Sequence, residues 1–552
     1  MNEQPENPEK PEQPKTEAPA PPRHVLEEKR RLSRSMLWKL QRTCYGAQAQ
    51  QAWHGPAKVP WFVTSNSFVA AAYARTMIGF LRDVVSPEAP FGATDPTQPL
   101  YVVELCAGSG HFGFLFANRL LAMKEALPAL ERLHVRYVMT DLVKANVDGW
   151  AAHERMKPLV ERGVLDFATF DLENDTEMRL LVSGETLAPG SLRNPMGVIA
   201  NYAFDSTLQD AFRVRGGILH EALLSILSTE RGDAEKPDAE TLKRLTFRYD
   251  SLPIELPYYR EPLLDGILAR YRDRLGDTSF LLPVGGLRAL TSLSTLTKGR
   301  LFLLSADKGL VREEEFTNPE DPQLAAHNQV FSLMVNYHAI GLWFEEQGGF
   351  ALHVPSRDVR LRASGFVLGA APGRAPETTH AFGEALARFG VYDYVSLATT
   401  LRPKEGFAPS LEAVLAALRL SDFDYHVFLS NASLLAKLCP KATQPLKRDL
   451  LAALERVWES FYPMDRDLPF EIARVLMALE RPMDALRFYK ESRRLFGEHE
   501  ATYFNTGLCL YRLQQRREAL QMIERALVLK PGYGPAREWR NRIETELREA
   551  KP

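Results

Sequence analysis

A short apolar strand that runs directly into a glycine turn constrains the fold of this chain more than any other feature. Residues 101–105 are apolar apart from Glu104, and Gly108 and Gly110 follow before an amphipathic helix that we expect over 112–130. Glycine lets the backbone approach a ligand closely and present its N–H groups at the start of a helix. The segment therefore predicts a binding loop at the carboxyl end of a strand.

The chain continues as an alternation of strands and helices, which is typical of an open, mostly parallel α/β sheet. Each expected strand leads to a polar residue, and open α/β sheets bind ligands beyond the carboxyl ends of their strands. These strands and polar residues are 135–140 with Asp141, 165–170 with Asp171, 197–200 with Asn201, and 301–305 followed by Asp307.

Composition and periodicity divide the chain into four regions. Residues 1–24 are dominated by Pro, Glu, Gln and Lys and are expected to form a disordered tail. We expect an N-terminal helical cap over 25–95 and a doubly wound, Rossmann-like α/β domain over 96–400, with a helical insertion at about 218–288. Residues 407–552 show only helical periodicity and are expected to form an all-α region.

An internal repeat of 34 residues, the period of tetratricopeptide repeats, is visible in the C-terminal region. Small residues are needed where the two helices of a hairpin cross, and a large residue fills the space between hairpins. Two ordinary amphipathic helices are the alternative. The clearest unit carries Tyr503, Gly507, Ala519, Ile523, Ala526 and Pro531, and a degenerate unit before it carries Ala473, Ala485, Tyr489, Ser492 and Gly497.

Charge and cysteine usage exclude several classes of function. The formal net charge is −2, so no global positive field favours nucleic acid or an anionic membrane as a partner. Cys44, Cys106, Cys439 and Cys509 share no metal-ligand spacing, which fits a reduced compartment and predicts no metal site. The sequence has no secretory signal and no apolar run of about 18 residues. We therefore expect a cytoplasmic protein.

Two cofactors compete for the glycine turn. Gly108-x-Gly110-x-x-Gly113 matches the fingerprint of dinucleotide-binding enzymes, which also need an acidic residue about 20 residues past the turn. Here the next acidic residue at a strand end is Asp141. Glu104, before the turn, is instead typical of doubly wound methyltransferases that use S-adenosylmethionine, where such a residue orients the loop or the methionine end of the cofactor.

The methyltransferase interpretation assigns the next two strand ends to the adenosyl group. Asp141 would bind the ribose hydroxyls, and Asp171 or the backbone of Leu172 would meet the edge of the adenine. An ordinary loop-capping role is the alternative for either aspartate.

Asn201 and Phe204 are the outer members of the Asn-x-x-aromatic signature found at the active site of amine and amide methyltransferases. An amide oxygen can accept a hydrogen bond from the target N–H, and an aromatic face can hold a planar or cationic group. The neighbouring Tyr202 and Asp205 are further candidates, Asp205 as polar support or base. A core aromatic beside a turn-forming asparagine is the alternative.

His338 is a candidate general base, because an unperturbed histidine has a pKa near 6.5. A packed or capping histidine is the alternative.

Over roughly residues 60–340 the chain resembles the MidA-type methyltransferases, a family that includes the mitochondrial complex I assembly factor that methylates a protein arginine. The segments that carry the resemblance are 62–74, 104–110, 201–212, 304–309 and 335–337. The resemblance implies a class I methyltransferase sheet and S-adenosylmethionine as cofactor. The positions implied as cofactor contacts are Thr64, Ser65, Glu104, Gly108 and Gly110, with active-site roles for Asn201 and Asp205.

Three residues depart from the family pattern: Cys106 replaces a glycine inside the cofactor loop, Tyr202 replaces a glutamate, and Leu208 replaces a proline. The sequence hypothesis is a methyltransferase that modifies a nitrogen of a protein or peptide, docked partly by the C-terminal repeats. One alternative is a catalytically degenerate methyltransferase fold that serves as an interaction scaffold. The other is a small-molecule methyltransferase of a biosynthetic pathway.

Overall fold

The computed structural model describes residues 23–48, 63–235, 238, 240–327, 330–355, 358–464 and 466–549. The predicted disordered tail, residues 1–24, lies outside the described residues except for its last two, and Phe62 of the family-like segment lies outside them as well.

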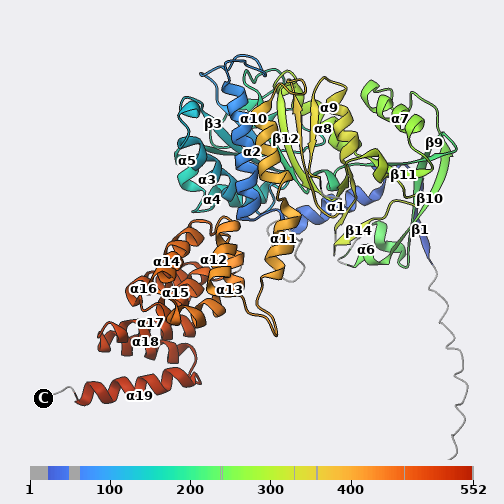
Figure 1. Ribbon diagram of the computed structural model, residues 1–552. Helices are drawn as coiled ribbons and strands as arrows, with labels where there is room; N and C mark the ends of the chain where they lie inside the picture. The colour runs from blue at the N-terminus through green and yellow to red at the C-terminus, as the bar shows by residue number, and fades with distance from the viewer. Residues whose placement is uncertain are drawn as a thin grey trace, which may run out of the picture.

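A seven-stranded sheet forms the centre of the molecule (Figure 1). Five strands in the order β12-β7-β2-β3-β4 are parallel, and β18 pairs antiparallel with both β12 and the edge strand β17. The open, mostly parallel α/β sheet expected from the sequence is confirmed. The strands are β2 (Leu100–Glu104), β3 (Val135–Asp141), β4 (Leu165–Thr169), β7 (Met196–Asn201), β12 (Leu301–Asp307), β17 (Phe350–His353) and β18 (Arg362–Leu368).

Helices cover both faces of this sheet because successive strand residues point to opposite sides. Val102 belongs to the core under one face and Val103 to the core under the other. The first face is covered by α2 (Ser67–Val85), α3 (His111–Glu125), α4 (Lys144–Ala152) and α10 (Pro376–Phe382). The second is covered by α7 (Pro262–Arg274), α8 (Val284–Leu296) and α9 (Tyr337–Glu345).

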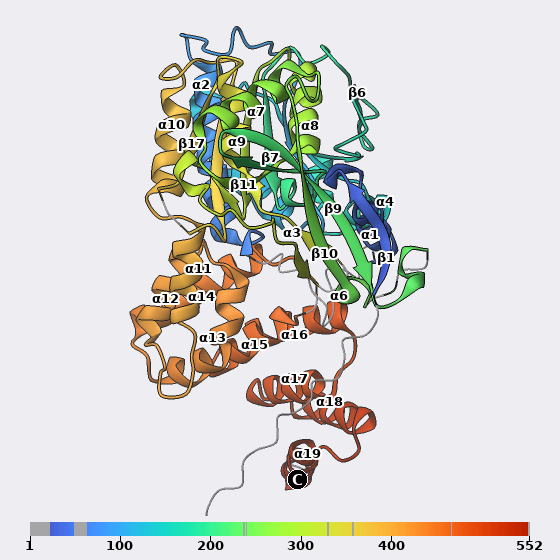
Figure 2. The same cartoon turned by 90° about the vertical axis from the view of Figure 1, so that its right-hand side faces the viewer.

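The expected helical insertion at about 218–288 is only partly helical: α7 and the start of α8 are helices, whereas β9, β10 and β11 belong to a second, antiparallel β-sheet. β9 pairs with β10 along one edge and with β8 and then β1 along the other (Figure 2). The apolar spacing of β9 fits a helix equally well, and only pairing with distant segments decides for a strand. The strands of this second sheet are β1 (His24–Arg30), β8 (Asp210–Arg215), β9 (Ile218–Ser228), β10 (Leu245–Pro253) and β11 (Thr278–Leu282). The short helix α6 (Thr241–Arg244) directly precedes β10.

The N-terminal cap is therefore only partly helical. The chain enters through β1, where we expected a helix from residue 25, and then forms α1 (Met36–Gln48) before α2. The strand joins β9 about 200 residues further along the chain, a pairing that local periodicity does not report.

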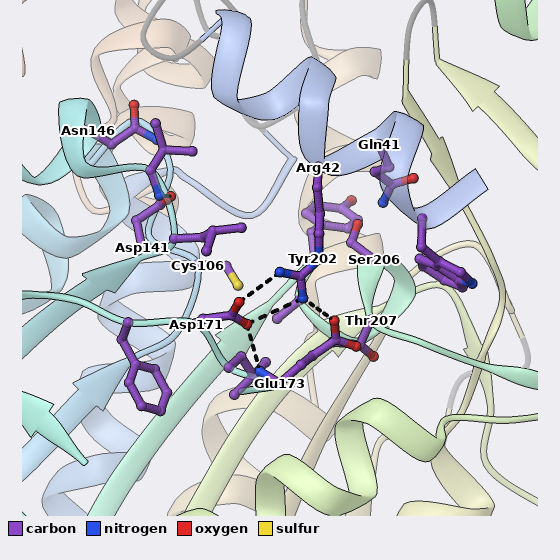
Figure 3. Close-up of a pocket in the computed structure, with 16 residues that line it drawn as sticks. Gln41, Arg42, Cys106, Asp141, Asn146, Asp171, Glu173, Tyr202, Ser206 and Thr207 are labelled. Atoms are coloured by element: carbon purple, nitrogen blue, oxygen red, sulfur yellow. Dashed lines mark hydrogen bonds and ion pairs between the residues drawn. The ribbon is translucent and has the colours of Figure 1, made fainter. Parts of the chain in front are cut away.

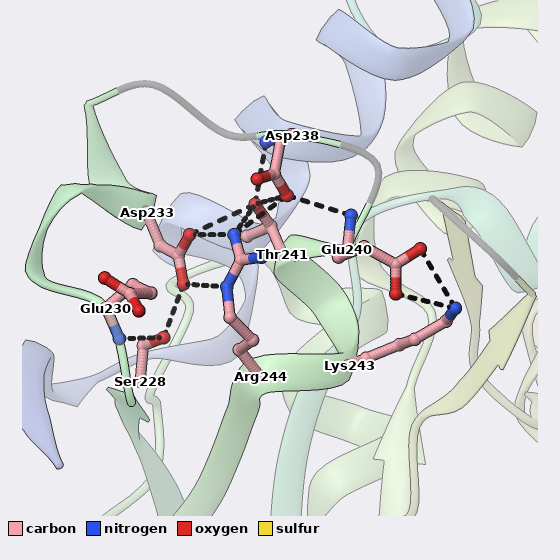
Figure 4. A network of polar contacts seen from close by, with 8 residues as sticks. All are labelled: Ser228, Glu230, Asp233, Asp238, Glu240, Thr241, Lys243 and Arg244. Atoms are coloured by element: carbon pink, nitrogen blue, oxygen red, sulfur yellow. Dashed lines mark hydrogen bonds and ion pairs between the residues drawn. The ribbon is translucent and has the colours of Figure 1, made fainter. Parts of the chain in front are cut away.

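The polar stretch between β9 and β10 forms a closed network rather than a simple linker (Figure 4). Asp233 is buried and accepts hydrogen bonds from the Arg244 guanidinium, with Nε 3.0 Å from Oδ2. Ser228 and Thr241 donate to the same carboxylate. The network fixes the connection between the two strands, at the point where β9 ends and β10 begins.

The C-terminal region consists of helices that descend below the sheet domain (Figure 1). They form antiparallel hairpins in which α16 and α18 begin 34 residues apart, at Pro482 and Arg516. The predicted small residues Ala473, Ala485 and Ala519 are completely buried. The helices are α11 (Val391–Thr400), α12 (Leu411–Leu420), α13 (Tyr425–Leu438), α14 (Gln444–Glu459), α15 (Leu468–Ala478), α16 (Pro482–Phe496), α17 (Glu500–Arg512), α18 (Arg516–Leu529) and α19 (Gly534–Glu549).

Within the described part of the chain, no helix combines the length and the apolar character that a membrane span requires.

Substitution of Gly507 by alanine tests the close crossing of α17 and α18. A Cβ at this position would lie 2.7 Å from Cγ1 of Ile523 and 3.1 Å from the carbonyl oxygen of Ala519. We expect Gly507→Ala to destabilise the helical region by about 1–3 kcal/mol in urea unfolding, because overpacking outweighs the gain in helix propensity. Gly266→Ala in α7 is the matched control, since no atom lies within 4 Å of its added Cβ. Equal stability of the two variants would contradict the crossing.

Candidate active site

The carboxyl ends of β2 and β7 meet at the point where the strand order of the sheet reverses. β3 and β4 follow β2 on one side, and β12 follows β7 on the other. Ligands bind at such switch points in open α/β sheets. A cavity lies here, lined by the loops after β2, β3, β4 and β7 and by α1 (Figure 3).

The glycine loop after β2 is held by Asp141 at the end of β3. The N–H of Gly108 donates to Oδ2 of Asp141 over 3.0 Å, and Oδ1 accepts a hydrogen bond from the N–H of Val143. Trp150 of α4 donates its indole N–H to the carbonyl of Gly108. Burial raises the pKa of Asp141 to about 6. Asp141 thus makes the contacts of the loop-capping alternative and also lines the cavity, and its binding of a ribose stays a prediction.

Glu104 lies behind the glycine loop and is not among the cavity-lining residues. Its side chain is 4% exposed and accepts a hydrogen bond from the Tyr137 hydroxyl over 2.6 Å. Burial raises the pKa of Glu104 to about 8, and the nearby Asp141 carboxylate adds to the rise. Gly113, the third glycine of the formal fingerprint, is required here because a Cβ would lie 2.7 Å from the Glu104 carboxylate. Glu104 therefore supports the loop from below.

Two non-glycine residues at the switch point have left-handed backbone conformations. Cys106 after β2 has φ +55° and Tyr202 after β7 has φ +49°, and both line the cavity. Such conformations cost about 1 kcal/mol or more and gather at functional sites. A glycine is favoured where Cys106 stands, which gives a physical reason for the family pattern. Gly108 and Gly110 also have positive φ, and Gly110 caps α3.

Asp171 and Leu172 line the far end of the cavity, after β4. Arg42 of α1 reaches across and donates to Asp171 over 2.7 Å and to Glu173 over 2.6 Å (Figure 3). Burial would raise the pKa of Asp171, but the Arg42 guanidinium holds it below its ordinary value. No sequence signal marks Arg42 as a site residue, because several arginines lie in and just before this amphipathic helix.

Asn201 ends β7 and is held from two sides. Its Oδ1 accepts hydrogen bonds from the Tyr73 hydroxyl over 2.8 Å and from the N–H of Ala306 over 3.1 Å. Since a backbone N–H can only donate, the atom facing Ala306 must be the amide oxygen. The amide NH2 is buried and has no hydrogen-bond partner among the described residues. The predicted role of the oxygen, which is to accept a target N–H, would require Tyr73 to move away.

Two buried carboxyl groups lie next to each other behind Tyr202. The N–H of Asp205 donates to Oδ2 of Asp307 over 3.1 Å, and the neighbouring Lys308 binds Ser332. Burial raises the pKa of Asp205 to about 6 and also raises that of Asp307, where the Asp205 carboxylate adds to the effect. At least one of the pair can therefore accept or release a proton near neutral pH. Asp307 was identified only as a residue that follows a strand.

Besides Glu104, eight predicted site residues are not among those that line the cavity: Thr64, Ser65, Gly108, Gly110, Asn201, Phe204, Asp205 and His338. Phe204 is completely buried in the core beside Gly286, so it presents no face to an acceptor in this structure, whereas Tyr202 does line the cavity. His338 interacts through Nδ1 with the Tyr271 hydroxyl over 2.9 Å and stacks on that ring, which matches the packed alternative. Thr64 and Ser65 precede α2 and are not among the cavity-lining residues.

No family model and no curated protein matches the chain. One solved structure similar to it is a methyltransferase candidate from Burkholderia thailandensis bound to S-adenosyl-homocysteine, with 12% identity and a TM-score of 0.35. The match covers 57% of this chain and 79% of that one. An uncharacterised protein of the same superfamily and organism has 10% identity and a TM-score of 0.35, with 62% and 94% coverage.

The third comparison concerns the C-terminal region. YrrB, a tetratricopeptide-repeat protein with a peptide-binding site, has 19% identity and a TM-score of 0.24, with coverage of 31% of this chain and 84% of that one. All three TM-scores lie below 0.5.

The buried Glu104 carboxyl predicts a pH-dependent stability. Its pKa is about 8 in the folded protein and 4.5 ordinarily, so the folded state binds the extra proton. Stability contributed by this group is complete below pH 4.5 and is lost as the pH rises through 8. The side chain of the Glu104→Gln variant is neutral at every pH. As the pH rises through this window, we expect the free energy of unfolding of the variant to increase relative to that of the wild type by at most about 1.4 kcal/mol per pH unit. Urea unfolding at pH 5, 6.5 and 8 measures the difference; parallel pH profiles would refute it.

The left-handed backbone at Cys106 predicts that glycine stabilises this position. We expect Cys106→Gly to unfold with a free energy about 1 kcal/mol higher than Cys106→Ala, because alanine retains the positive-φ cost while glycine does not. Chemical denaturation of the two variants side by side provides the measurement. If alanine proves as stable as glycine, the loop does not carry this strain.

Proposed function

We propose that the chain is an S-adenosylmethionine-dependent methyltransferase that transfers the methyl group to a nitrogen of a protein or peptide. The observation that carries the proposal is the cavity at the β2–β7 switch point, which is lined by Cys106 of the glycine loop, by Asp141 and Asp171, and by Tyr202 after β7. The residues fit the cofactor: the Asp141 carboxylate suits ribose hydroxyls, and Asp171 with the Leu172 backbone suits the adenine edge. S-adenosylmethionine would supply a methyl group activated by a sulfonium.

The same residues speak against a dinucleotide enzyme. The acidic residue at the end of β3 lies 33 residues after Gly108, beyond the spacing of about 20 that the dinucleotide fold uses. β18 is antiparallel to its neighbours, whereas the six strands of the dinucleotide sheet are parallel.

On the acceptor side, the chain's own residues position a nucleophile and receive its proton. Tyr73 and Ala306 fix the Asn201 amide, so the loop from Tyr202 to Asp205 starts from a rigid point. Asp205 and Asp307 would receive the proton that a nitrogen acceptor loses on methylation, since one of two adjacent buried carboxyls ionises near neutral pH. Holding the acceptor in line with the methyl group would supply most of the rate enhancement.

Calorimetric titration with S-adenosylhomocysteine tests the proposal. We expect one binding event per chain, no heat with NAD, and affinity about tenfold or more weaker in Asp141→Asn, because the carboxylate loses one of its acceptors. Asp148→Asn is the matched control, since Asp148 lies exposed on α4 and, among the residues that the structure describes, pairs only with Lys144. Wild-type protein that gives no heat with S-adenosylhomocysteine would leave the scaffold alternative in its place.

A further inference from the structure

The C-terminal helical region packs directly on the beginnings of the two helices that flank the candidate active site. Asp424, the residue before α13, accepts a hydrogen bond from the N–H of Ser67 at the start of α2, over 2.8 Å. His111, the first residue of α3 and the neighbour of Gly110, is completely buried, and its ring contacts those of Tyr425 and Tyr462. The helical region is therefore packed against the sheet domain rather than attached to it by a linker alone.

A groove of about 390 Å³ opens beside this contact. One side is the segment that leads into α2, from Val63 to Asn66, and the other comes from α11, α12 and α13. Val395, Leu401 and Val427 give it apolar walls. Its volume lies within the range of pockets that bind ligands.

Two arginines stand at the surface of this groove without a carboxylate partner. Arg402 and Arg466 are both exposed, and neither makes an ion pair with a carboxylate in the described part of the chain. The acidic residue of the groove, Asp424, is committed to Ser67 and to His426. The exposed charge of the groove is therefore positive, in a protein whose net charge is −2.

A buried hydrogen-bond acceptor also lines the groove. Asn431 is 4% exposed, and its amide NH2 donates to the carbonyl of Val427 over 2.9 Å. Its Oδ1 has no hydrogen-bond partner within the described residues. A buried acceptor left unpaired has lost its hydrogen bond to water, and a donor from a bound chain would replace that bond.

We propose that this groove docks an extended acidic segment of a protein. Its carboxylates pair with Arg402 and Arg466, an N–H of the segment donates to Oδ1 of Asn431, and apolar side chains pack between them. Two arginines in a partly apolar groove suit a peptide, whereas a nucleic acid would need a longer row of cations along its phosphates. The inference deepens the proposed function and rests on it, because it assigns the methyl acceptor to proteins with an acidic segment.

Selection of peptides from a random 12-residue display library on the immobilised full-length chain tests this proposal. We expect the wild type to enrich peptides rich in Asp and Glu, and the Arg402→Glu/Arg466→Glu double variant to bind those peptides at least about tenfold more weakly. Arg419→Glu/Arg517→Glu is the matched control, because both arginines are exposed and lie outside the groove. Asn431→Leu should weaken binding while keeping the preference for acidic peptides.

Selection without acidic enrichment, or acidic peptides that bind the double variant and the wild type equally, overturns the proposal. Displacement of the selected peptides by a single-stranded oligonucleotide at equal concentration would also overturn it, in favour of a general polyanion site. Titration of the same proteins with S-adenosylhomocysteine separates the two hypotheses. Peptide binding without cofactor binding overturns the proposed function and leaves the groove as a docking site. Cofactor binding without selection of acidic peptides leaves the proposed function and overturns the docking site.

Discussion

The parallel pairing of β2 with β7 is the constraint on which the candidate site depends. Because these neighbours in the sheet lie about 100 residues apart in the chain, their pairing brings the glycine loop and the Asn201 segment to the same edge. Every other site group is positioned relative to this pair: Asp141 caps the loop after β2, and Ala306 fixes the amide after β7. A shift of register would separate the two halves of the cavity.

Burial gives this edge of the sheet an unusual electrostatic character. Glu104, Asp141, Asp205 and Asp307 are all buried, and burial raises the pKa of each carboxyl group. Burial makes the ionised form of these carboxyls unfavourable. A cationic ligand nearby, such as a sulfonium, would stabilise the ionised form. Two of these groups, Asp205 and Asp307, lie close enough to Tyr202 to add to the rise of its pKa that burial causes. The burial that makes these carboxyls costly to ionise is thus the same feature that gives them the raised pKa values on which the proposed chemistry relies.

Sequence reasoning located the central sheet well, because strands and polar strand ends are local signals. It failed where long-range contacts decide. The Ile218–Ser228 strand has apolar spacing that also suits a helix, and its pairing with the N-terminal strand is not visible locally. Of the two aromatic candidates after β7, Tyr202 lines the cavity and Phe204 is buried in the core, and no sequence pattern indicates the left-handed backbone at Tyr202. Arg42 reaches the cavity from a helix whose other face packs on the antiparallel sheet and on Phe331, contacts that the local sequence does not report.

Two distant parts of the chain hold the candidate site from opposite directions. The N-terminal strand joins the antiparallel sheet, and the helix after it extends Arg42 to Asp171 and Glu173, while the carboxylate of Glu173 also accepts the N–H of Leu208 in the loop after β7. From the other side, the helical region supports the starts of α2 and α3 through Asp424 and His111. A disturbance of either contact acts on the loops that line the cavity, so the affinity of the site for its ligands is a property of the whole chain. The cost of this arrangement is that the sheet domain alone lacks the supports that keep its loops in place.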